Sequence, residues 1–180
     1  MPLTKIKSLG ITDGTIVNAD INASAAIDST KLSGVGITIA DNWRMTSDLT
    51  ADTNPITNWE RVDTSGQGTI GTALTLSSGN FTFPSTGIYL ITMTACLEEG
   101  TTTDNLIQFD MYYNTTRIMQ IFQETALASG FTTGSNQTLI NVTNTAHQMY
   151  FRVVNITNAA RLIGDSTANT TNFTAIRLGS

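Results

Sequence analysis

The chain has 180 residues, of which 40% are hydrophobic and only 13% are charged, and its formal net charge is −5. This composition indicates a globular chain long enough for one core. With a pI near 4.6 it offers no basic stripe for phosphates, which argues against a nucleic-acid partner. We see no signal-peptide core and no apolar run long enough for membrane insertion, so we expect synthesis in a cytoplasm.

Residues 1–40 differ from the rest of the chain because they contain no aromatic residue. Large aliphatic side chains recur there about every five residues, which fits neither a helix nor a strand. One aliphatic side chain per turn buries too little surface alone, whereas copies arranged around an axis would form an apolar seam. We therefore predict an arm for attachment and oligomerisation; a disordered linker is the alternative. The arm residues are Ile6, Ile11, Ile16, Ile21, Ile27 and Leu32.

Residues 41–180 contain all the aromatic residues and are predicted to form one β domain. Runs of β-branched and aromatic residues, separated by Gly, Asn, Ser and Thr, predict about nine strands and no convincing helix. This number of strands without a repeat of fixed length favours a two-sheet sandwich or jelly roll. In chain order the predicted strands are 40–47, 57–64, 72–83, 87–99, 105–113, 116–125, 136–145, 147–157 and 172–180.

Several predicted strands are apolar on both faces. In the strand around residues 88–97, Tyr89 and Ile91 alternate with Ile88 and Leu90. A two-layer sandwich covers only one face of each sheet, so a second apolar face predicts a further buried surface, most simply a partner subunit. A permanent interface of this kind buries on the order of 2,000 Å² or more.

The segment SSGNFTFPSTGIYLITMTACL places Phe81, Pro84, Gly87 and Tyr89 in an F-x-x-P-x-x-G-x-Y pattern, and NFTAIRL lies close to residue 180. Both resemble the globular heads of complement component C1q and the tumour necrosis factor superfamily. The resemblance covers residues 41–180 and implies an all-β jelly-roll sandwich, assembled as a homotrimer with its inner sheet facing the threefold axis. The predicted trimer-interface residues are Ile88, Leu90, Thr92, Ile176 and Leu178.

The segment DGTIVNADINASAAIDSTKLSG, within residues 1–40, is similar to phrases in tail-fibre and head-fibre proteins of bacteriophages. This resemblance implies a protein of the virion surface, made in the host cytoplasm and bound through its arm to capsid or tail proteins. We therefore predict a non-enzymatic structural protein, a trimeric head fibre or capsid decoration that exposes a jelly-roll knob. The alternative is a receptor-binding tail-fibre tip that adsorbs to host surface glycan or protein.

The sequence contains no grouping of residues typical of catalysis or of cofactor binding. His147 and Cys96 are the only histidine and cysteine, so a His/Cys metal cluster and an intrachain disulfide are excluded. We interpret Cys96, within an alternating strand, as a small buried hydrophobic residue. An enzyme acting on polysaccharide would need paired carboxylates in a cleft, and none stands out. We predict no enzyme activity and no cofactor.

Two sets of charged residues leave alternatives open. Glu98, Glu99 and Asp104 follow a predicted strand and are weak candidates for a metal site. The resembled family sometimes holds Ca²⁺ near the trimer apex, whereas a solvated acidic loop is the alternative. Arg152 and Arg177 lie within apolar strands, where they either pair with carboxylates or extend to solvent.

Overall fold

The computed structural model describes residues 21–22, 24–25, 27, 36–100, 106–123 and 130–179. The chain divides into two units, residues 1–35 and residues 36–180. A division after residue 40, as predicted, would cut the first strand, which begins at Ile39. The functions assigned to the two parts stay predictions.

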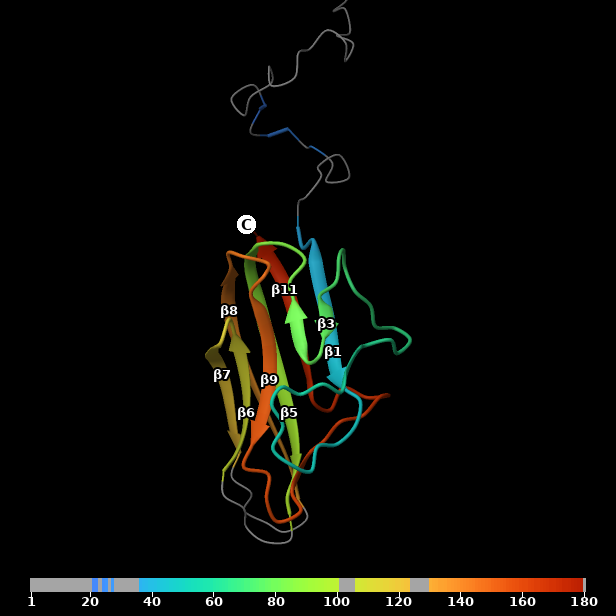
Figure 1. The fold of residues 1–180 in the computed structure, drawn as a ribbon. Helices are drawn as coiled ribbons and strands as arrows, with labels where there is room; N and C mark the ends of the chain where they lie inside the picture. Colours follow the sequence, from blue (N-terminus) through green and yellow to red (C-terminus); the bar gives the residue numbers. More distant parts are fainter. Residues whose placement is uncertain are drawn as a thin grey trace, which may run out of the picture. The chain divides into compact units, whose positions relative to one another are not determined.

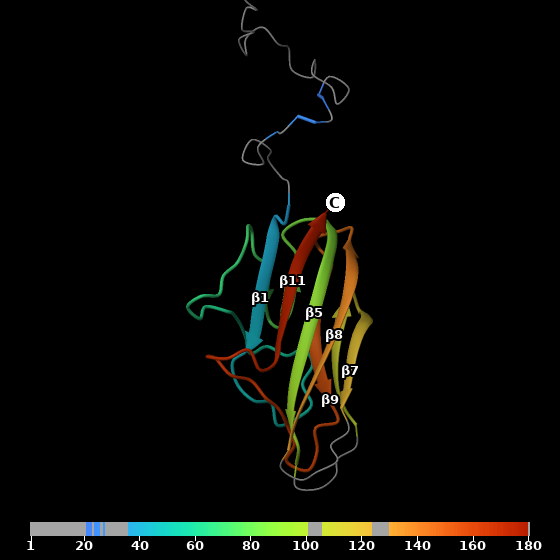
Figure 2. The same ribbon diagram turned by 180° about the vertical axis from the view of Figure 1, so that it is seen from behind.

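Residues 36–179 form a sandwich of two antiparallel sheets (Figure 1). Sheet A has the order β10–β5–β11–β1–β2, and β8 pairs with β5. Figure 2 shows β1, β11, β5 and β8 side by side on this face. Sheet B has the order β3–β4–β9–β6–β7. The strands are β1 (Ile39–Met45), β2 (Trp59–Arg61), β3 (Thr75–Ser77), β4 (Asn80–Thr82), β5 (Gly87–Glu98), β6 (Ile107–Tyr113), β7 (Thr116–Gln123), β8 (Phe131–Val142), β9 (Gln148–Val154), β10 (Arg161–Leu162) and β11 (Asn172–Gly179).

The prediction of an all-β, two-sheet sandwich is confirmed, and the described residues contain no helix. Accordingly, in this part of the chain no helix is long and apolar enough to cross a membrane. The predicted strand 72–83 was wrong as one strand, because Ser78 and Gly79 adopt positive φ angles of 48° and 81° and turn the chain between β3 and β4. The short strand β10 was not predicted, since two residues give no periodic pattern.

The core between the sheets is built around a cluster of aromatic rings. Phe81 lies edge-on to Phe173 with ring centroids 4.7 Å apart, and Trp59 contacts Phe151 at 5.0 Å. Trp43 adds an edge contact to Phe81 at 5.1 Å. All five side chains are buried. These contacts join β1, β2 and β11 of sheet A to β4 and β9 of sheet B, so the two layers share one core.

The Phe-Pro-Gly-Tyr pattern forms the corner that leads into β5. The Tyr89 hydroxyl donates to the carbonyl oxygen of Ser85 at 2.9 Å, and its ring lies edge-on to Phe83 with centroids 4.7 Å apart. Gly87 has a φ angle of +135°, which side chains disfavour. A Cβ atom there would collide with the carbonyl oxygen of Gly179 and approach Arg177 Nε at 2.8 Å. The glycine therefore lets β5 start directly beside β11.

Replacing Gly87 with alanine tests this close approach. We expect Gly87→Ala to lower the free energy of unfolding by about 2–4 kcal/mol, because the substitution adds a backbone collision to an unfavourable φ angle. Gly66→Ala is the matched control, since Gly66 has a φ of +91° but open space around it. Denaturant unfolding followed by tryptophan fluorescence measures both. Equal losses for the two variants would contradict the role of the Gly179 contact.

Candidate assembly and binding surfaces

The outer face of sheet A carries an apolar row that the sandwich leaves uncovered. In β5 the side chains of Tyr89 and Ile91 are buried in the core, whereas those of Ile88, Leu90 and Thr92 point the other way and are only partly buried. Strand alternation therefore separates the two apolar faces that the sequence indicated.

Strand register brings apolar residues of four strands and one neighbouring segment into line on this face. Leu90 pairs with Leu139 of β8 on one side and with Ile176 of β11 on the other. Ile176 pairs in turn with Ala40 of β1, which bridges to Ile70. Directly opposed residues contact one another across strands, so these five form a continuous band, here called the apolar row. Leu139 is 58% exposed and Ile70 is 49% exposed.

The structure places four of the five predicted interface residues on this face. Ile88, Leu90 and Ile176 belong to its apolar half, whereas Thr92 pairs with Thr174 and Gln137 and begins a polar half. Leu178 lies at a bulge between Arg177 and Gly179 and is 51% exposed. Their role in a trimer stays a prediction. Sequence reasoning missed Leu139 and Ile70. Leu139 alternates with the buried Ile140, and this pattern could have identified Leu139 as an outward-facing apolar residue. Ile70 lies outside any strand, so no strand pattern indicated it.

A second apolar patch lies along the edge of the sandwich where β7 and β8 run near each other. Asn136 Nδ2 donates to the carbonyl oxygen of Gln120 at 3.0 Å across this edge. The exposed side chains of Ile118, Phe122 and Phe131 lie on the same two strands, and Phe131 is 67% exposed. Ile118 and Phe122 alternate with buried Met119 and Ile121 and face outward from sheet B, and we call these two residues the β7–β8 edge patch. Phe131 pairs with Glu98 and, like Leu139, faces outward from sheet A. The knob thus has two unlike apolar surfaces, a flat face and an edge.

Comparison with solved structures identifies the type of sandwich. Eiger TNF from S. frugiperda aligns with a TM-score of 0.59 and 12% identity, covering 79% of this chain and 93% of that one. Murine APRIL aligns at 0.56 and 10%, covering 78% and 98%. PRD1 vertex protein P5 aligns at 0.51 and 18%, covering 80% and 99%. The fold is a jelly roll of the tumour necrosis factor type. No family model matches the sequence, and no curated protein matches it significantly.

The outer face of the jelly roll's sheet B carries a buried carboxylate. Asp110 of β6 is fully buried although its side chain points away from the core. Its Oδ2 atom accepts hydrogen bonds from Arg152 Nε at 2.7 Å and from Gln108 Nε2 at 2.6 Å, and Arg117 lies 3.9 Å away. The Asp110 carboxylate raises the pKa of Arg152, so the ion pair persists at any physiological pH. Arg152 therefore pairs with a carboxylate, one of the two alternatives left open.

Two tyrosine rings stack beside this ion pair. Tyr112 of β6 and Tyr150 of β9 lie with centroids 4.8 Å apart and planes 7° from parallel. The guanidinium of Arg152 lies 5.0 Å from the centre of the Tyr112 ring, a favourable cation–π geometry. Burial raises the pKa of Tyr150, and the neighbouring Tyr112 raises it further. Tyr150 therefore presents a neutral hydroxyl group.

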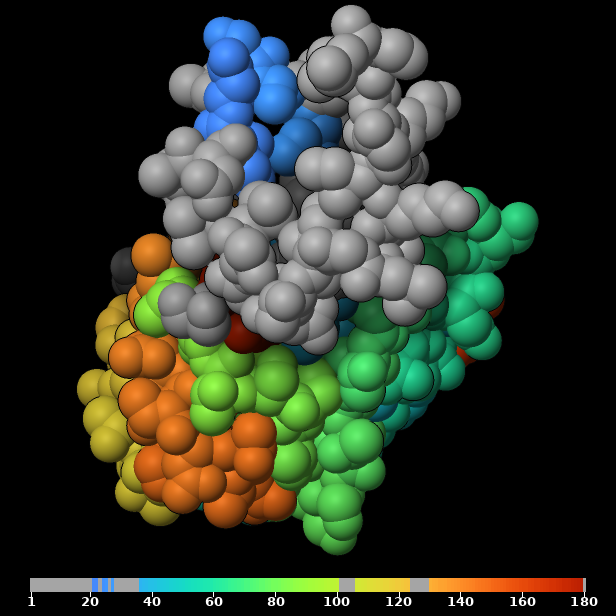
Figure 3. All heavy atoms as spheres, turned by 90° about the horizontal axis from the view of Figure 1, so that it is seen from above, coloured from blue at the N-terminus to red at the C-terminus, as the bar shows by residue number. Residues whose placement is uncertain are grey.

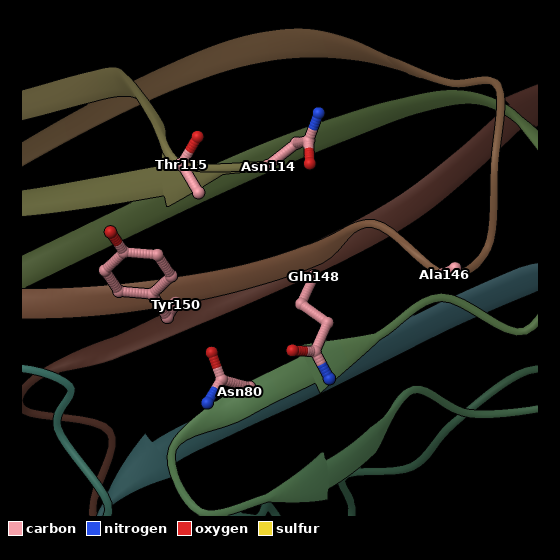
Figure 4. Close-up of a pocket in the computed structure, with 6 residues that line it drawn as sticks. All are labelled: Asn80, Asn114, Thr115, Ala146, Gln148 and Tyr150. Atoms are coloured by element: carbon pink, nitrogen blue, oxygen red, sulfur yellow. The ribbon is translucent and has the colours of Figure 1, made fainter.

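An open hollow of about 170 Å³ begins at Tyr150. Figure 4 shows its side chains, which come from β4, from β9 and from the two turns between β6 and β7 and between β8 and β9. In the end view of Figure 3, the orange segment around residues 143–147 lies beside the olive β6–β7 hairpin. Sequence reasoning did not predict this hollow, because its residues are scattered along the chain. The lining residues are Asn80, Asn114, Thr115, Ala146, Gln148 and Tyr150.

The weak metal candidates are not brought together in the part of the chain that is described. Glu98 forms an ion pair with Arg161, and Glu99 accepts a long hydrogen bond of 3.5 Å from Thr132 Oγ1. Asp104 lies outside the described residues. Among the residues that the structure describes, no group of three His, Cys, Asp or Glu side chains could hold a metal ion. Because Glu98 is paired with Arg161, it does not support a calcium site in this loop.

Two other sequence interpretations meet direct observations. Cys96 is a free thiol on the outer face of β5 and only partly buried, so placing it in the core was wrong. Strand alternation is the reason, because its neighbours Ala95 and Leu97 take the inward positions. Arg177 donates to the carbonyl oxygen of Thr86 at 2.9 Å, which fixes the end of β11.

Within residues 1–35 the structure describes one turn. Ser24 N donates to Asn22 Oδ1 at 2.8 Å and Ala25 N donates to the Asn22 carbonyl at 2.8 Å, as expected for asparagine in a turn. Ile21 and Ile27 flank this turn and are exposed. The remaining predicted arm residues, Ile6, Ile11, Ile16 and Leu32, lie outside the described residues.

The Asp110–Arg152 pair yields a stability prediction. We expect Arg152→Met to lower the free energy of unfolding by about 1–3 kcal/mol, because it leaves a buried carboxylate short of its strongest donor. Arg161→Met is the control: Arg161 bridges Asp48 and Glu98 in a solvent-exposed setting, where ion pairs contribute little. Thermal unfolding followed by circular dichroism compares the variants. A larger loss for Arg161→Met would contradict this account.

Proposed function

We propose that this chain is a non-enzymatic structural protein of a bacteriophage virion. It acts as a homotrimer, its jelly-roll knob exposed on the virion surface and residues 1–35 binding a capsid or tail protein. The corresponding role is that of a head fibre or capsid decoration. The observation that carries the proposal is the apolar row, which a single copy leaves open to solvent.

We expect a partner to bury the apolar row because its side chains are contiguous and form a flat surface. Leu139, Leu90 and Ile176 are direct neighbours on three adjacent strands, so their side chains form a flat hydrophobic surface rather than scattered exposed residues. Contiguous patches of this kind mark interaction sites in soluble proteins. At about 25 cal/mol per Å² of buried apolar area, covering such a face stabilises an assembly substantially.

The second apolar surface favours a ring over a two-fold dimer. A dimer formed face to face through the apolar row would leave Ile118 and Phe122 of the β7–β8 edge patch in water. If the edge patch of one copy instead covers the apolar row of the next, both surfaces are buried at once. Such head-to-tail contacts close into a ring when the rotation between copies allows it. Three copies is the number that the resemblance to tumour necrosis factor heads implies.

The assignment to a virion has separate support. The phrases in residues 13–34 are similar to those of phage fibre proteins, and the fold is shared with PRD1 vertex protein P5. Ile21 and Ile27 of this segment are exposed and offer apolar contact area to a partner surface.

A second candidate function is a receptor-binding fibre tip. The hollow at Tyr150 favours it, because amide and aromatic side chains converge there on the face opposite the apolar row. The two functions are compatible, since the same knob can be anchored at one surface and bind a ligand at another.

The trimer is tested by solution mass at micromolar concentration. We expect the full chain to have the mass of three copies, and Leu90→Asp and Leu139→Asp to give single copies, because a charge in the covered row is desolvated without a partner. Thr82→Asp, on the outer face of sheet B, is the matched control and should remain trimeric. Circular dichroism verifies that each variant keeps its β structure. A single-copy mass for the unchanged chain would refute the trimer.

Capsid binding tests the arm. We expect capsids of the parent phage that lack this protein to capture the full chain but not residues 36–180. A full-length variant with Ile11→Ser, Ile16→Ser and Ile21→Ser should be captured at least tenfold less, because each loses apolar contact area. Equal capture of the shortened and full chains would contradict attachment through the arm.

A further inference from the structure

The hollow at Tyr150 lies where two turns and two strands of sheet B meet. Asn80 begins β4 and pairs with Tyr150 of β9, and Tyr150 pairs on its other side with Tyr112 of β6. The backbone N–H of Asn114 donates to the carbonyl oxygen of Gln148 at 3.0 Å, which fixes the β6–β7 turn beside the start of β9. Backbone hydrogen bonds therefore hold the strands and turns around the hollow in place, and the lining side chains extend outward from them.

The polar groups of the hollow are largely available for a ligand. Among the described residues, no hydrogen bond engages the side chains of Asn114 and Thr115 or the hydroxyl of Tyr150, and Gln148 has only a 3.5 Å contact to Thr82 Oγ1. Asn80 Nδ2 donates to the carbonyl oxygen of Ser78 at 3.2 Å, which leaves its amide oxygen for a ligand. Each amide offers a donor and an acceptor at neighbouring atoms. Hydroxyl groups on a ligand, which donate and accept together, match this arrangement.

The charge of the lining side chains and the volume of the hollow further restrict the class of ligand. None of the six lining side chains is ionised at neutral pH: three are amides, one is a hydroxyl, one a methyl and one a tyrosine. Arg152, whose charge acts on Tyr150, is paired with Asp110. A hollow of about 170 Å³ is smaller than the usual 300–1,000 Å³ of drug-sized sites, so it fits one ring-sized unit. Tyr150 adds an apolar ring surface against which C–H groups can pack.

The turn at Asn114–Thr115 departs from the residues that its geometry favours. Both residues have positive φ angles, of 46° and 68°, as in a two-residue hairpin turn where Asn-Gly is preferred. Thr115 is β-branched and is strained in this conformation, whereas glycine would be relaxed. The strained threonine places its hydroxyl and methyl groups at the hollow, which glycine could not do.

We propose that this hollow binds a neutral sugar residue of a glycan or polysaccharide. The sugar ring packs against Tyr150, and its hydroxyls bond to the amides of Asn80, Asn114 and Gln148. This inference deepens the second candidate function and does not require the trimer, because the hollow lies on the face opposite the apolar row. Binding by one copy is weak, in the millimolar range, as expected for a small open site. Three copies on one particle raise the apparent affinity for a polymer.

Ligand-observed NMR tests the site with glucose, galactose, mannose, N-acetylglucosamine and, as charged counterparts, glucuronic acid and N-acetylneuraminic acid. We expect saturation transfer from the full chain to at least one neutral sugar. Gln148→Ala should weaken that binding about two- to tenfold, the loss of one or two hydrogen bonds. Gln120→Ala, an outward-facing glutamine of the same sheet outside the hollow, is the matched control.

Thr115→Gly separates a binding role from a structural one. Because glycine relaxes the turn, this variant should raise the midpoint of thermal unfolding while lowering sugar affinity. If Thr115 served folding alone, replacing it would lower the stability of the protein, and the affinity for sugar would fall with that stability. Absence of transfer to all neutral sugars, transfer to the acidic sugars alone, or unchanged affinity in both Gln148→Ala and Thr115→Gly would each overturn the proposal. The mass of the assembly is unaffected by any of these results.

Discussion

The two-layer architecture imposes one constraint on this chain: each strand can turn only one side toward the common core. In β5 that side is taken by Tyr89 and its in-phase neighbours, so the equally apolar Ile88 and Leu90 must face outward. Sheet register then aligns Leu90 with apolar residues of β8 and β11. A local alternation in one strand thereby becomes a surface that extends across the sheet. The proposed oligomer follows from that surface rather than from any bound group.

The two outer faces of the sandwich have opposite chemistry. Sheet A presents aliphatic side chains at one end, whereas sheet B presents paired charges, stacked tyrosines and amides. Asp110 is buried on the outer side of its sheet because Arg152 and Gln108 cover it and supply hydrogen bonds. This arrangement keeps the part of sheet B around Asp110 polar and ordered at the same time. A face of this kind suits selective contact with a polar ligand, and the opposite face suits permanent contact with another copy.

Much of the fold was predictable because it depends on local patterns. Alternation over long segments located the ends of β5, β6, β9 and β11 within three residues, and the Phe81–Tyr89 pattern indicated the type of jelly roll. Predictions failed where the structure depends on distant pairing. Ile70 joins the apolar row only because it bridges to Ala40, and Cys96 lies outside the core only because its neighbours fill it. The hollow escaped prediction for the same reason, since Asn80, Asn114 and Tyr150 meet through sheet register.

The position of β11 has a consequence for how the protein is made. This strand spans residues 172–179, yet it lies inside sheet A between β5 and β1. During translation these residues must leave the ribosome before sheet A is complete, and until then β1 and β5 lack the strand that lies between them. A polypeptide that breaks off earlier lacks Ile176, the centre of the apolar row. A chain that ends before residue 176 would therefore lack part of the surface through which the proposed oligomer forms.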